Sequence, residues 1–410
     1  MRPYITSGEH NLSQTDYQLQ NRMLTTIKNR FHTYGFQESG TSVFQDYDMY
    51  SSVIGTVQKH DMIKTINPSG DVLVLRPDAT IPIARQMATE KTTYHRLFYV
   101  QDIFRQPKNQ SHHKAFTQAG VECFGDDTPE NDAEMIALAV HILNDLRFDQ
   151  FKIEIGHAGF FKDLIDGLPI SPEELEKLQE LIQSKNLIEI GPFLDSLSVG
   201  ETIVEAIQAI PLLYGDPERV MEKASEITLN DNMKQTIDYM KAVYDLFKAY
   251  DVEDCVVFDL GLINHMAYYS GVIFQGYITG YSKPVLMGGR YNDLTEQFGA
   301  DMPAIGFGCI IDYLLEARKA DEQETEMENT VDVGIYYDQN TINAALPAAT
   351  QLRNAGYQVL TQSHDNGSIP SRYTVHFTKE ASLLIHQTKQ RTFQSISELE
   401  HLLQIEMRDN

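Results

Sequence analysis

The chain has 410 residues, of which 42% are hydrophobic and 22% are charged, and its formal net charge is −25 at pH 7. This length suffices for two or three folded domains, and no run of about 20 apolar residues is present that would span a membrane. The amino terminus lacks a signal-peptide pattern, so a cytoplasmic location is expected. Because nucleic acid is bound largely through Lys and Arg, the acidic balance argues against a nucleic acid partner.

Cysteine and histidine usage predicts neither disulfides nor a metal site. Cys123, Cys255 and Cys309 lie far apart without a CxxC pair, and each is expected to be a small buried hydrophobic residue. His112 and His113 are adjacent, but no matched acid or cysteine accompanies them to complete a ligand set. No metal and no cofactor are predicted.

The first third of the chain predicts one helix followed by strands. Residues 16–34 place apolar side chains at helical spacing, and Gly35 follows at the position of a C-terminal cap. A strand-like segment ending at Phe44 comes next. Three further segments rich in β-branched and aromatic residues are predicted to form strands of an antiparallel sheet: residues 72–75, 96–104 and 115–124.

The middle of the chain predicts a helical block between two groups of strands. Residues 171–250 are almost wholly helical in pattern, with Ser171 and Glu174 at capping-box spacing and Pro172 at the first helical position. Before the block we expect a helix over 131–146, a strand over 152–155 and a helix over 159–166. After it we expect strands over 255–260 and 272–277 and a helix that begins near Phe307.

A polar segment divides the chain into two predicted domains. Residues 318–330 are acidic and lack apolar periodicity, which is typical of a solvated linker. The linker separates a domain of residues 1–317 from a small α/β domain of residues 331–410. In the small domain we expect a strand over 331–337, a helix over 344–354 closed by Gly356, and a strand over 357–360.

Several motifs occur in a fixed order along the first three quarters of the chain. They are LRPDAT (75–80), the run 97–105 continued by FTQAGVECFG (116–125), AYYSGVIF (267–274), MGGRYNDL (287–294) and AIGFGCIIDYLLEA (304–317). Together they resemble the catalytic domain of histidyl-tRNA synthetase. The resemblance implies an α+β fold with a class II aminoacyl-tRNA synthetase-like antiparallel sheet flanked by helices. It also implies a helical insertion at about 171–250, a dimer interface built by the first helix and strand, and a shortened anticodon-binding domain at the carboxyl terminus.

The resemblance predicts a pocket for the ammonium group of a free amino acid. Such a pocket needs acids and neutral polar groups at fixed positions. Asp78, Gln118 and Glu122 match the family residues that hold the ammonium. Gln118 and Glu122 are four apart in a predicted strand, so both point to the same face. Taken singly, Glu122 or Asp78 is more often a solvated strand residue.

The rest of the ligand is assigned by the same resemblance. Arg105 matches the arginine that contacts the carboxylate, and Tyr268 and Tyr269 match the tyrosine pair that lines the imidazole pocket. Thr80 and Arg290 lie in segments that are expected to face the same cleft. Alone, an arginine can be a surface cation and a tyrosine a core residue, so the ordered set carries the prediction.

The groups that would activate an amino acid are missing. Adenylate formation needs positive charge near the reacting phosphate, and the family supplies an arginine in the motif RGLDYY. Here the stretch is NHMAYY, with Asn264 at the arginine position and Ala267 at the aspartate, and a neutral amide cannot replace a guanidinium. The second arginine, which stacks on adenine, is replaced by Tyr313, and Ile310 stands at a family glycine. The chain is therefore predicted not to be an enzyme.

A synthetase-like chain that keeps the amino-acid pocket and loses adenylation resembles the regulatory subunits of ATP phosphoribosyltransferase. The resemblance implies a short-form catalytic subunit as partner, a second copy of the chain in a dimer, and free histidine as effector. Its role would be the non-catalytic regulation of the first step of histidine biosynthesis, with feedback inhibition by histidine. Two alternatives stay open: a working histidyl-tRNA synthetase, and a scaffold for the catalytic subunit that binds no ligand.

Overall fold

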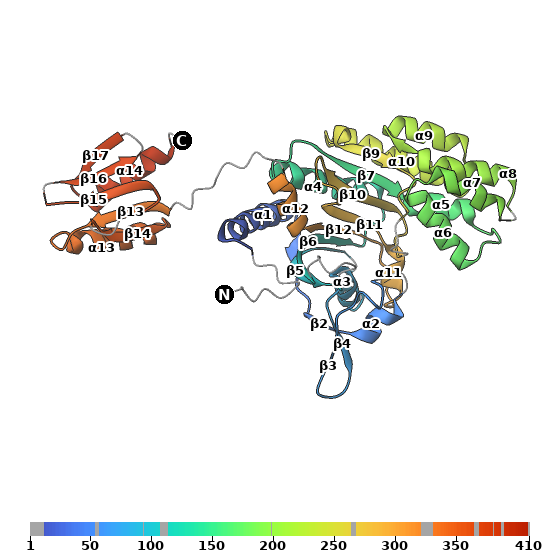
Figure 1. The fold of residues 1–410 in the computed structure, drawn as a ribbon, viewed down its shortest axis with the longest axis horizontal. Coiled ribbons are helices and arrows are strands. Elements are labelled where there is room, and N and C mark those ends of the chain that lie inside the picture. The colour runs from blue at the N-terminus through green and yellow to red at the C-terminus, as the bar shows by residue number, and fades with distance from the viewer. Residues whose placement is uncertain are drawn as a thin grey trace, which may run out of the picture. The chain divides into compact units, whose positions relative to one another are not determined.

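The structure, a computed structural model, describes residues 12–53, 57–92, 94–106, 114–197, 199–263, 268–320, 331–364, 369–379, 381–386 and 389–408. The chain divides into two compact units, Met1–Glu322 and Gln323–Asn410 (Figure 1). Helix α12 (Ile311–Ala320) is the last element of the first unit. It continues past residue 318, where the sequence predicts the start of the linker. The remainder of that segment, 321–330, lies outside the described residues.

The first unit is built on a nine-stranded sheet with the order β1-β5-β6-β12-β11-β10-β7-β9-β8. Neighbouring strands are antiparallel except in the pairs β1–β5 and β7–β9. The strands are β1 (Gln37–Glu38), β5 (His95–Phe104), β6 (Ala115–Phe124), β7 (Phe151–His157), β8 (Tyr214–Gly215), β9 (Val256–Asp259), β10 (Val272–Ile278), β11 (Leu286–Arg290) and β12 (Ala304–Ile310). The predicted sheet is thus confirmed, with two parallel pairs near its edges.

Residues 72–75 form the predicted strand, but not in this sheet. Strand β4 (Val72–Leu75) pairs with β2 (Phe44–Asp46) and β3 (Lys64–Ile66) in a separate three-stranded sheet. Its assignment to the main sheet is therefore wrong, because strand propensity reports how residues fit a pleated surface and not which strand they pair with. Phe44 begins β2 rather than ending a strand, and helix α2 (Tyr47–Ser52) follows directly.

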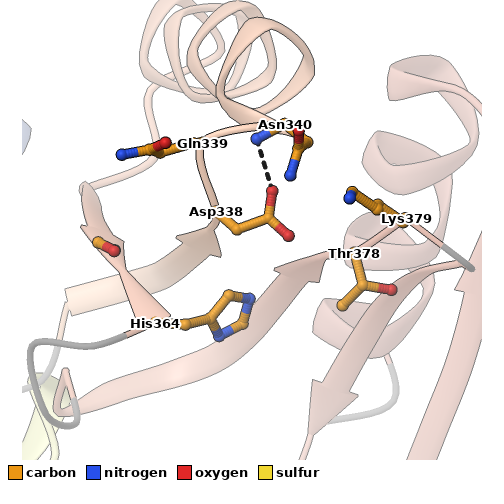
Figure 2. Close-up of a pocket in the computed structure, with 7 residues that line it drawn as sticks. Asp338, Gln339, Asn340, His364, Thr378 and Lys379 are labelled. Carbon is orange, nitrogen blue, oxygen red and sulfur yellow. Dashed lines mark hydrogen bonds between the residues drawn. The ribbon is translucent and has the colours of Figure 1, made fainter.

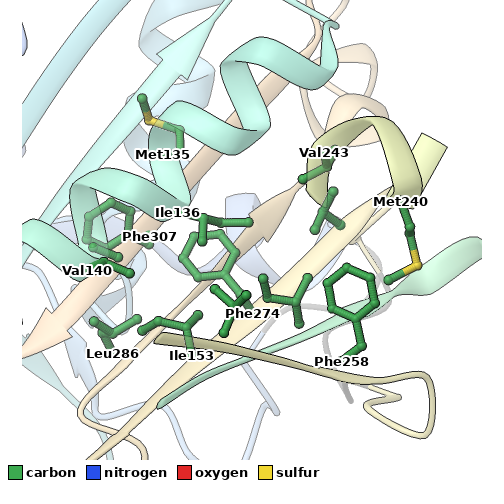
Figure 3. Packing of buried hydrophobic residues seen from close by; sticks show 14 of the residues in the cluster. Met135, Ile136, Val140, Ile153, Met240, Val243, Phe258, Phe274, Leu286 and Phe307 are labelled. Atoms are coloured by element: carbon green, nitrogen blue, oxygen red, sulfur yellow. The ribbon is translucent and has the colours of Figure 1, made fainter. Parts of the chain in front are cut away.

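Helices cover one face of the nine-stranded sheet and form the main core with it. They include α1 (Gln14–Thr33), α4 (Pro129–Asp145), α5 (Ala158–Ile165), α10 (Asp231–Ala249) and α12. Ile136 and Val140 of α4 pack against Phe274 and Phe307 of the sheet (Figure 3). Because side chains alternate along a strand, the residues between these apolar ones face the opposite side of the sheet. That side holds the candidate site.

Strand β12 extends further than the sequence pattern predicts. It pairs along its whole length with β6 and along most of it with β11, so α12 begins at Ile311 and the predicted helix start near Phe307 is wrong. The run AIGFGCI places Ile305, Phe307 and Cys309 on the core face and glycines on the other. This is period-two alternation. It is not evident from the sequence, because a glycine has no side chain that would indicate a buried or an exposed face.

The helical block predicted over 171–250 is confirmed, with one short strand inside it. Its helices are α6 (Pro172–Gln183), α7 (Leu187–Asp195), α8 (Glu201–Ala209), the 3₁₀ turn η1 (Ile210–Leu212), α9 (Pro217–Glu226) and α10. The capping box is present: the Glu174 N–H donates to Ser171 Oγ at 3.3 Å, and the Ser171 N–H donates to Glu174 Oε2 at 2.8 Å. Strand β8 lies inside the block and attaches it to the edge of the main sheet through β9.

The second unit is a five-stranded sheet with the order β14-β13-β15-β16-β17. Its elements are β13 (Val331–Tyr337), α13 (Ile342–Asn354), β14 (Val359–Ser363), β15 (Ser371–Phe377), β16 (Ser382–His386), β17 (Lys389–Phe393) and α14 (Ile396–Arg408). Gly356 has a φ of 94°, a left-handed conformation that suits the predicted end of α13. Within the described parts of the chain, none of the helices combines the length and apolar composition that crossing a bilayer requires.

Candidate functional site

Glycines on β12 make room for two polar side chains of β6. In the antiparallel register Gly306 lies opposite Glu122, and Ile310 lies opposite Gln118. A Cβ at Gly306 would overlap the Glu122 carboxylate, and a Cβ at Gly308 would overlap the Gln118 amide. Glu122 and Gln118 therefore lie across the glycine strand, on the face away from the main core. The Gln118 side chain has no hydrogen-bond partner among the described residues, so its amide is available to a ligand.

Glu122 is a buried carboxylate held at both oxygens. Glu122 is only 1% exposed to solvent. The Thr80 hydroxyl donates to Oε1 at 2.7 Å, and the Tyr291 hydroxyl donates to Oε2. Burial raises the pKa of Glu122 to about 8, although both hydroxyls act in the opposite direction. A cation placed beside this group would favour its ionised form.

Asp78 and Arg105 lie next to each other at the N-terminus of helix α3 (Thr80–Met87). Oδ1 of Asp78 accepts the backbone N–H of Ile81 at 2.9 Å, and the backbone N–H of Thr80 also acts on this carboxylate. Arg105 donates from Nε to the Pro77 carbonyl at 2.7 Å. Burial raises the pKa of Asp78 to about 6, and the Arg105 charge opposes that rise. The pair thus offers one carboxylate and one cation from neighbouring segments.

Three tyrosines form an aromatic wall beside Glu122. The ring centroids of Tyr268 and Tyr269 lie 4.8 Å apart, and the Tyr268 ring meets Tyr291 edge-on at 6.0 Å. A Cβ at Gly289 would overlap the Tyr269 ring, so this glycine also makes room for the site. Burial raises the pKa of Tyr269 above its usual value, so its hydroxyl stays protonated at neutral pH. Tyr291 was not among the residues predicted from the sequence, although it lies inside one of the motifs.

Arg290 points away from this site. The prediction that it faces the same cleft as Thr80 is therefore wrong. Arg290 is 3% exposed and pairs with Asp132 of α4, to which Nε donates at 2.9 Å. Its Nη1 also lies 3.1 Å from Oδ1 of Asp127. The cause is strand alternation: because Gly289 faces the site, its neighbour on β11 faces the helices. Arg290 therefore belongs to the structural link between β11 and α4.

Tyr313, at the position where the resemblance to histidyl-tRNA synthetase predicts an arginine, belongs to an aromatic cluster. The Tyr313 ring lies 6.0 Å from the Tyr281 ring, and Lys283 Nζ lies 4.6 Å from the Tyr313 centroid. Ile310 is buried opposite Gln118. No guanidinium is supplied from this helix position. Asn264 and Ala267, which replace the other activating residues, lie outside the described residues.

The predicted burial of the cysteines is confirmed for Cys123 and Cys309 and is wrong for Cys255, which ends the 3₁₀ turn before β9 and is only partly buried. Cys123 and Cys309 are buried and unpaired, and burial raises the pKa of their thiols to about 11 and about 12. Cys255 is partly exposed. In the part of the chain that the structure describes, no group of three or more potential metal ligands occurs. His112 and His113 lie outside that part.

Comparisons with known proteins agree with the resemblance that the motifs indicate. A family model described as histidyl-tRNA synthetase matches residues 8–314. A protein of Oceanobacillus iheyensis named ATP phosphoribosyltransferase regulatory subunit is 44% identical over 392 residues, which are 95% of this chain and 96% of that protein. This chain belongs to the ATP phosphoribosyltransferase regulatory subunit family. The predicted family is thus confirmed.

Other members and the solved structures give the same result. An ATP phosphoribosyltransferase regulatory subunit of Acetivibrio thermocellus is 32% identical over 361 residues, 87% of this chain and 86% of that one. A Bacillus halodurans structure described as an ATP phosphoribosyltransferase regulatory subunit/histidyl-tRNA synthetase has a TM-score of 0.79 at 26% identity, covering 90% of this chain and 94% of that chain. Histidyl-tRNA synthetase from Nostoc sp. PCC 7120 has a TM-score of 0.83 at 17% identity, covering 99% and 100%. The last comparison supports the class II synthetase-like fold alone.

Proposed function

We propose that this chain is the non-catalytic regulatory subunit of an ATP phosphoribosyltransferase and that its pocket around Glu122 binds free histidine. The observation that carries the histidine site is a buried carboxylate that faces aromatic rings across a glycine strand. The family membership supports assembly with a short-form catalytic subunit, and we place the chain as a dimer in the cytoplasm. Three unpaired cysteines suit that reducing compartment.

Each group of a histidine zwitterion has a matching group in the pocket. Glu122, Asp78 and the amide oxygen of Gln118 would accept hydrogen bonds from the ammonium, since charge-assisted hydrogen bonds are the strong ones. Arg105 would hold the carboxylate. Tyr268 and Tyr269 would flank the imidazole, because aromatic rings stack on planar groups and their hydroxyls supply polar contacts.

Regulation then follows from linkage between two sites. If histidine binds one arrangement of the complex more tightly than another, it shifts the population by that difference in affinity and by no more. The chain itself then needs no catalytic residue. Tyr313 in place of a cation supports this division of labour, because a phenol cannot stabilise the charge of a reacting triphosphate as a guanidinium does.

The test combines the chain with a short-form catalytic subunit. We expect the mixture to be more active than the catalytic subunit alone and to be inhibited by histidine. In Glu122→Gln the ammonium loses its ionised partner, so histidine affinity should fall by about 1.5–3 kcal/mol, or roughly 10–150-fold. Calorimetry measures this directly. A folded variant with unchanged affinity would refute the site, and a wild type without saturable heat would favour the ligand-free scaffold.

Histidine binding should also release a proton. At pH 7 a group with a pKa of about 8 is mostly protonated, and an ammonium ligand would ionise it. The affinity should therefore fall as the pH is lowered below about 8, by at most about tenfold per pH unit. In calorimetry at pH 7, phosphate and Tris buffers should give different heats for the wild type and the same heat for Glu122→Gln. Equal heats for the wild type would contradict proton release.

The raised pKa of Glu122 also determines how the free energy of unfolding depends on pH. Because the folded pKa of Glu122 is raised to about 8 from 4.5, the folded state binds more protons than the unfolded state between these values. Its contribution to the stability of the ligand-free chain is thus fully present below about pH 4.5 and is lost as the pH rises through about 8. Glu122→Gln should remove this dependence from urea denaturation curves.

A further inference from the structure

The second unit has an open cavity of about 630 Å³ that is separate from the site around Glu122. Strand β13 lies between β14 and β15 and is parallel to both. The cavity is lined by residues that follow these three strands, among them Asp338, His364 and Lys379 (Figure 2). In open α/β sheets, ligands bind outside the carboxyl ends of the strands, where successive connections leave in opposite directions. The cavity lies at such a point, because β13 leads through α13 to β14 and the chain then returns to β15.

Asp338 presents one carboxylate oxygen to this cavity. Its Oδ1 accepts the backbone N–H of Asn340 at 2.7 Å and that of Thr341 at 3.0 Å. The Asn340 N–H keeps the pKa of Asp338 below its usual value, so the carboxylate is ionised at neutral pH. Oδ2 has no hydrogen-bond partner within the described residues. The carboxylate is thus held by the turn that precedes α13, and it gives the cavity a fixed negative charge.

Lys379 supplies a positive charge across the same cavity. Its side chain is exposed and forms no ion pair with any residue that the structure describes, although its charge acts on Asp338. Residues 331–410 contain eight Asp and Glu and six Lys and Arg, so the strong acidity of the whole chain does not arise in this unit. A ligand here faces one free charge of each sign.

His364 adds a planar surface to the cavity. Its ring is nearly parallel to that of His376, with centroids 5.1 Å apart and planes at 10°. Tyr336 lies parallel to His376 at 4.9 Å. Burial, followed by the neighbouring His364, lowers the pKa of His376, so this ring is uncharged at neutral pH. His364 is thereby backed by aromatic rings, while its own exposed part lines the cavity.

We propose that this cavity binds a small zwitterion with a planar ring, namely a free aromatic or imidazole amino acid. Its ammonium contacts Oδ2 of Asp338, its carboxylate contacts the Lys379 ammonium, and its ring lies against His364. Opposite charges and a ring surface at fixed places match this class better than a dianion, because the single lysine would leave a second negative charge beside Asp338. The proposal is independent of the histidine site around Glu122.

The test uses the full chain carrying Glu122→Gln, which weakens the first site. L-Histidine, L-phenylalanine, L-alanine and histamine are titrated by calorimetry. We expect saturable binding of histidine or phenylalanine and at least about tenfold weaker binding of alanine, which has no ring, and of histamine, which has no carboxylate. No saturable heat from any amino acid would overturn the proposal.

Two further variants locate this binding. Asp338→Asn keeps an oxygen for the N–H groups of Asn340 and Thr341 and replaces the free acceptor by a donor, so it should fold normally and bind at least about tenfold more weakly. Lys379→Gln should weaken histidine but not histamine, whereas Lys389→Gln, on β17, should change nothing. Unchanged affinity in Asp338→Asn and Lys379→Gln would refute the site. If instead the Glu122 assignment is at fault, Glu122→Gln will titrate like the wild type while Asp338→Asn still loses one site.

Discussion

Replacing Arg290 by methionine is expected to lower the free energy of unfolding by about 3–5 kcal/mol. Asp132, its partner, is fully buried, and without the guanidinium its charge would be left with the Tyr239 hydroxyl at 2.6 Å as a partner. Arg290 also donates to the Asp126 carbonyl at 2.9 Å and to Asn292 Oδ1 at 3.2 Å. One side chain thus links β11 to α4 and to the turn before it, and Asp132 extends the link to α10.

Urea denaturation of the wild type and the variant measures this difference. Lys248→Met is the matched control, because Lys248 forms an exposed ion pair with Glu218 at 3.0 Å, and such pairs contribute roughly 0–1 kcal/mol. The double variant R290M/D132L removes both charges and should recover part of the loss. A loss below about 1 kcal/mol in Arg290→Met would mean that the pair is not buried as the structure has it.

The same variant separates a structural role from a binding role. Because Arg290 faces the helices, Arg290→Met that is still folded at low temperature should bind histidine as the wild type does. A large loss of histidine affinity in the folded variant would show that Arg290 faces the ligand site, as the sequence motif alone predicts. The measurement therefore decides between the motif and the strand register.

Much of the fold can be predicted from local patterns in the sequence. Strand β6 is predicted from its β-branched and aromatic residues, and its bounds, Ala115–Phe124, are predicted without error. Ser171 and Glu174 likewise form the capping box that their spacing predicts. The face on which a residue lies is harder to read. Arg290 follows two glycines, and without side chains there the alternation cannot be followed to the arginine.

The residues of the candidate site are predictable only where a family motif supplies them. Asp78 and Thr80 come from one segment and Glu122 from another, and their meeting depends on where α3 packs against the sheet. Tyr291 was missed because its contact with Glu122 joins residues far apart in sequence. The partner of β4 was missed for the same reason, since pairing between distant segments leaves no local signal.

The glycines of β12 allow stability and binding to be separated. The three atoms nearest to a Cβ in Gly308→Ala all belong to the Gln118 side chain, and this flexible side chain can move aside. We therefore expect a folded protein in which the displaced amide lowers histidine affinity by roughly tenfold, or about 1.4 kcal/mol. Calorimetry on the variant checks the affinity, and an affinity equal to that of the wild type would contradict a role for Gln118.

Gly306→Ala should act mainly on the fold. Its Cβ would meet the Glu122 carboxylate and also the backbone carbonyl of Val121, which is fixed by the pairing of β6 and β12. Overpacking of this kind costs about 1–3 kcal/mol, so Gly306→Ala should unfold at lower urea concentration than Gly308→Ala. Gly191→Ala is the control, because in α7 its Cβ would meet only Gln208 Nε2 at 3.4 Å. Equal stability of the two β12 variants would show that the strand yields at both positions, and the glycines would then serve the pocket alone.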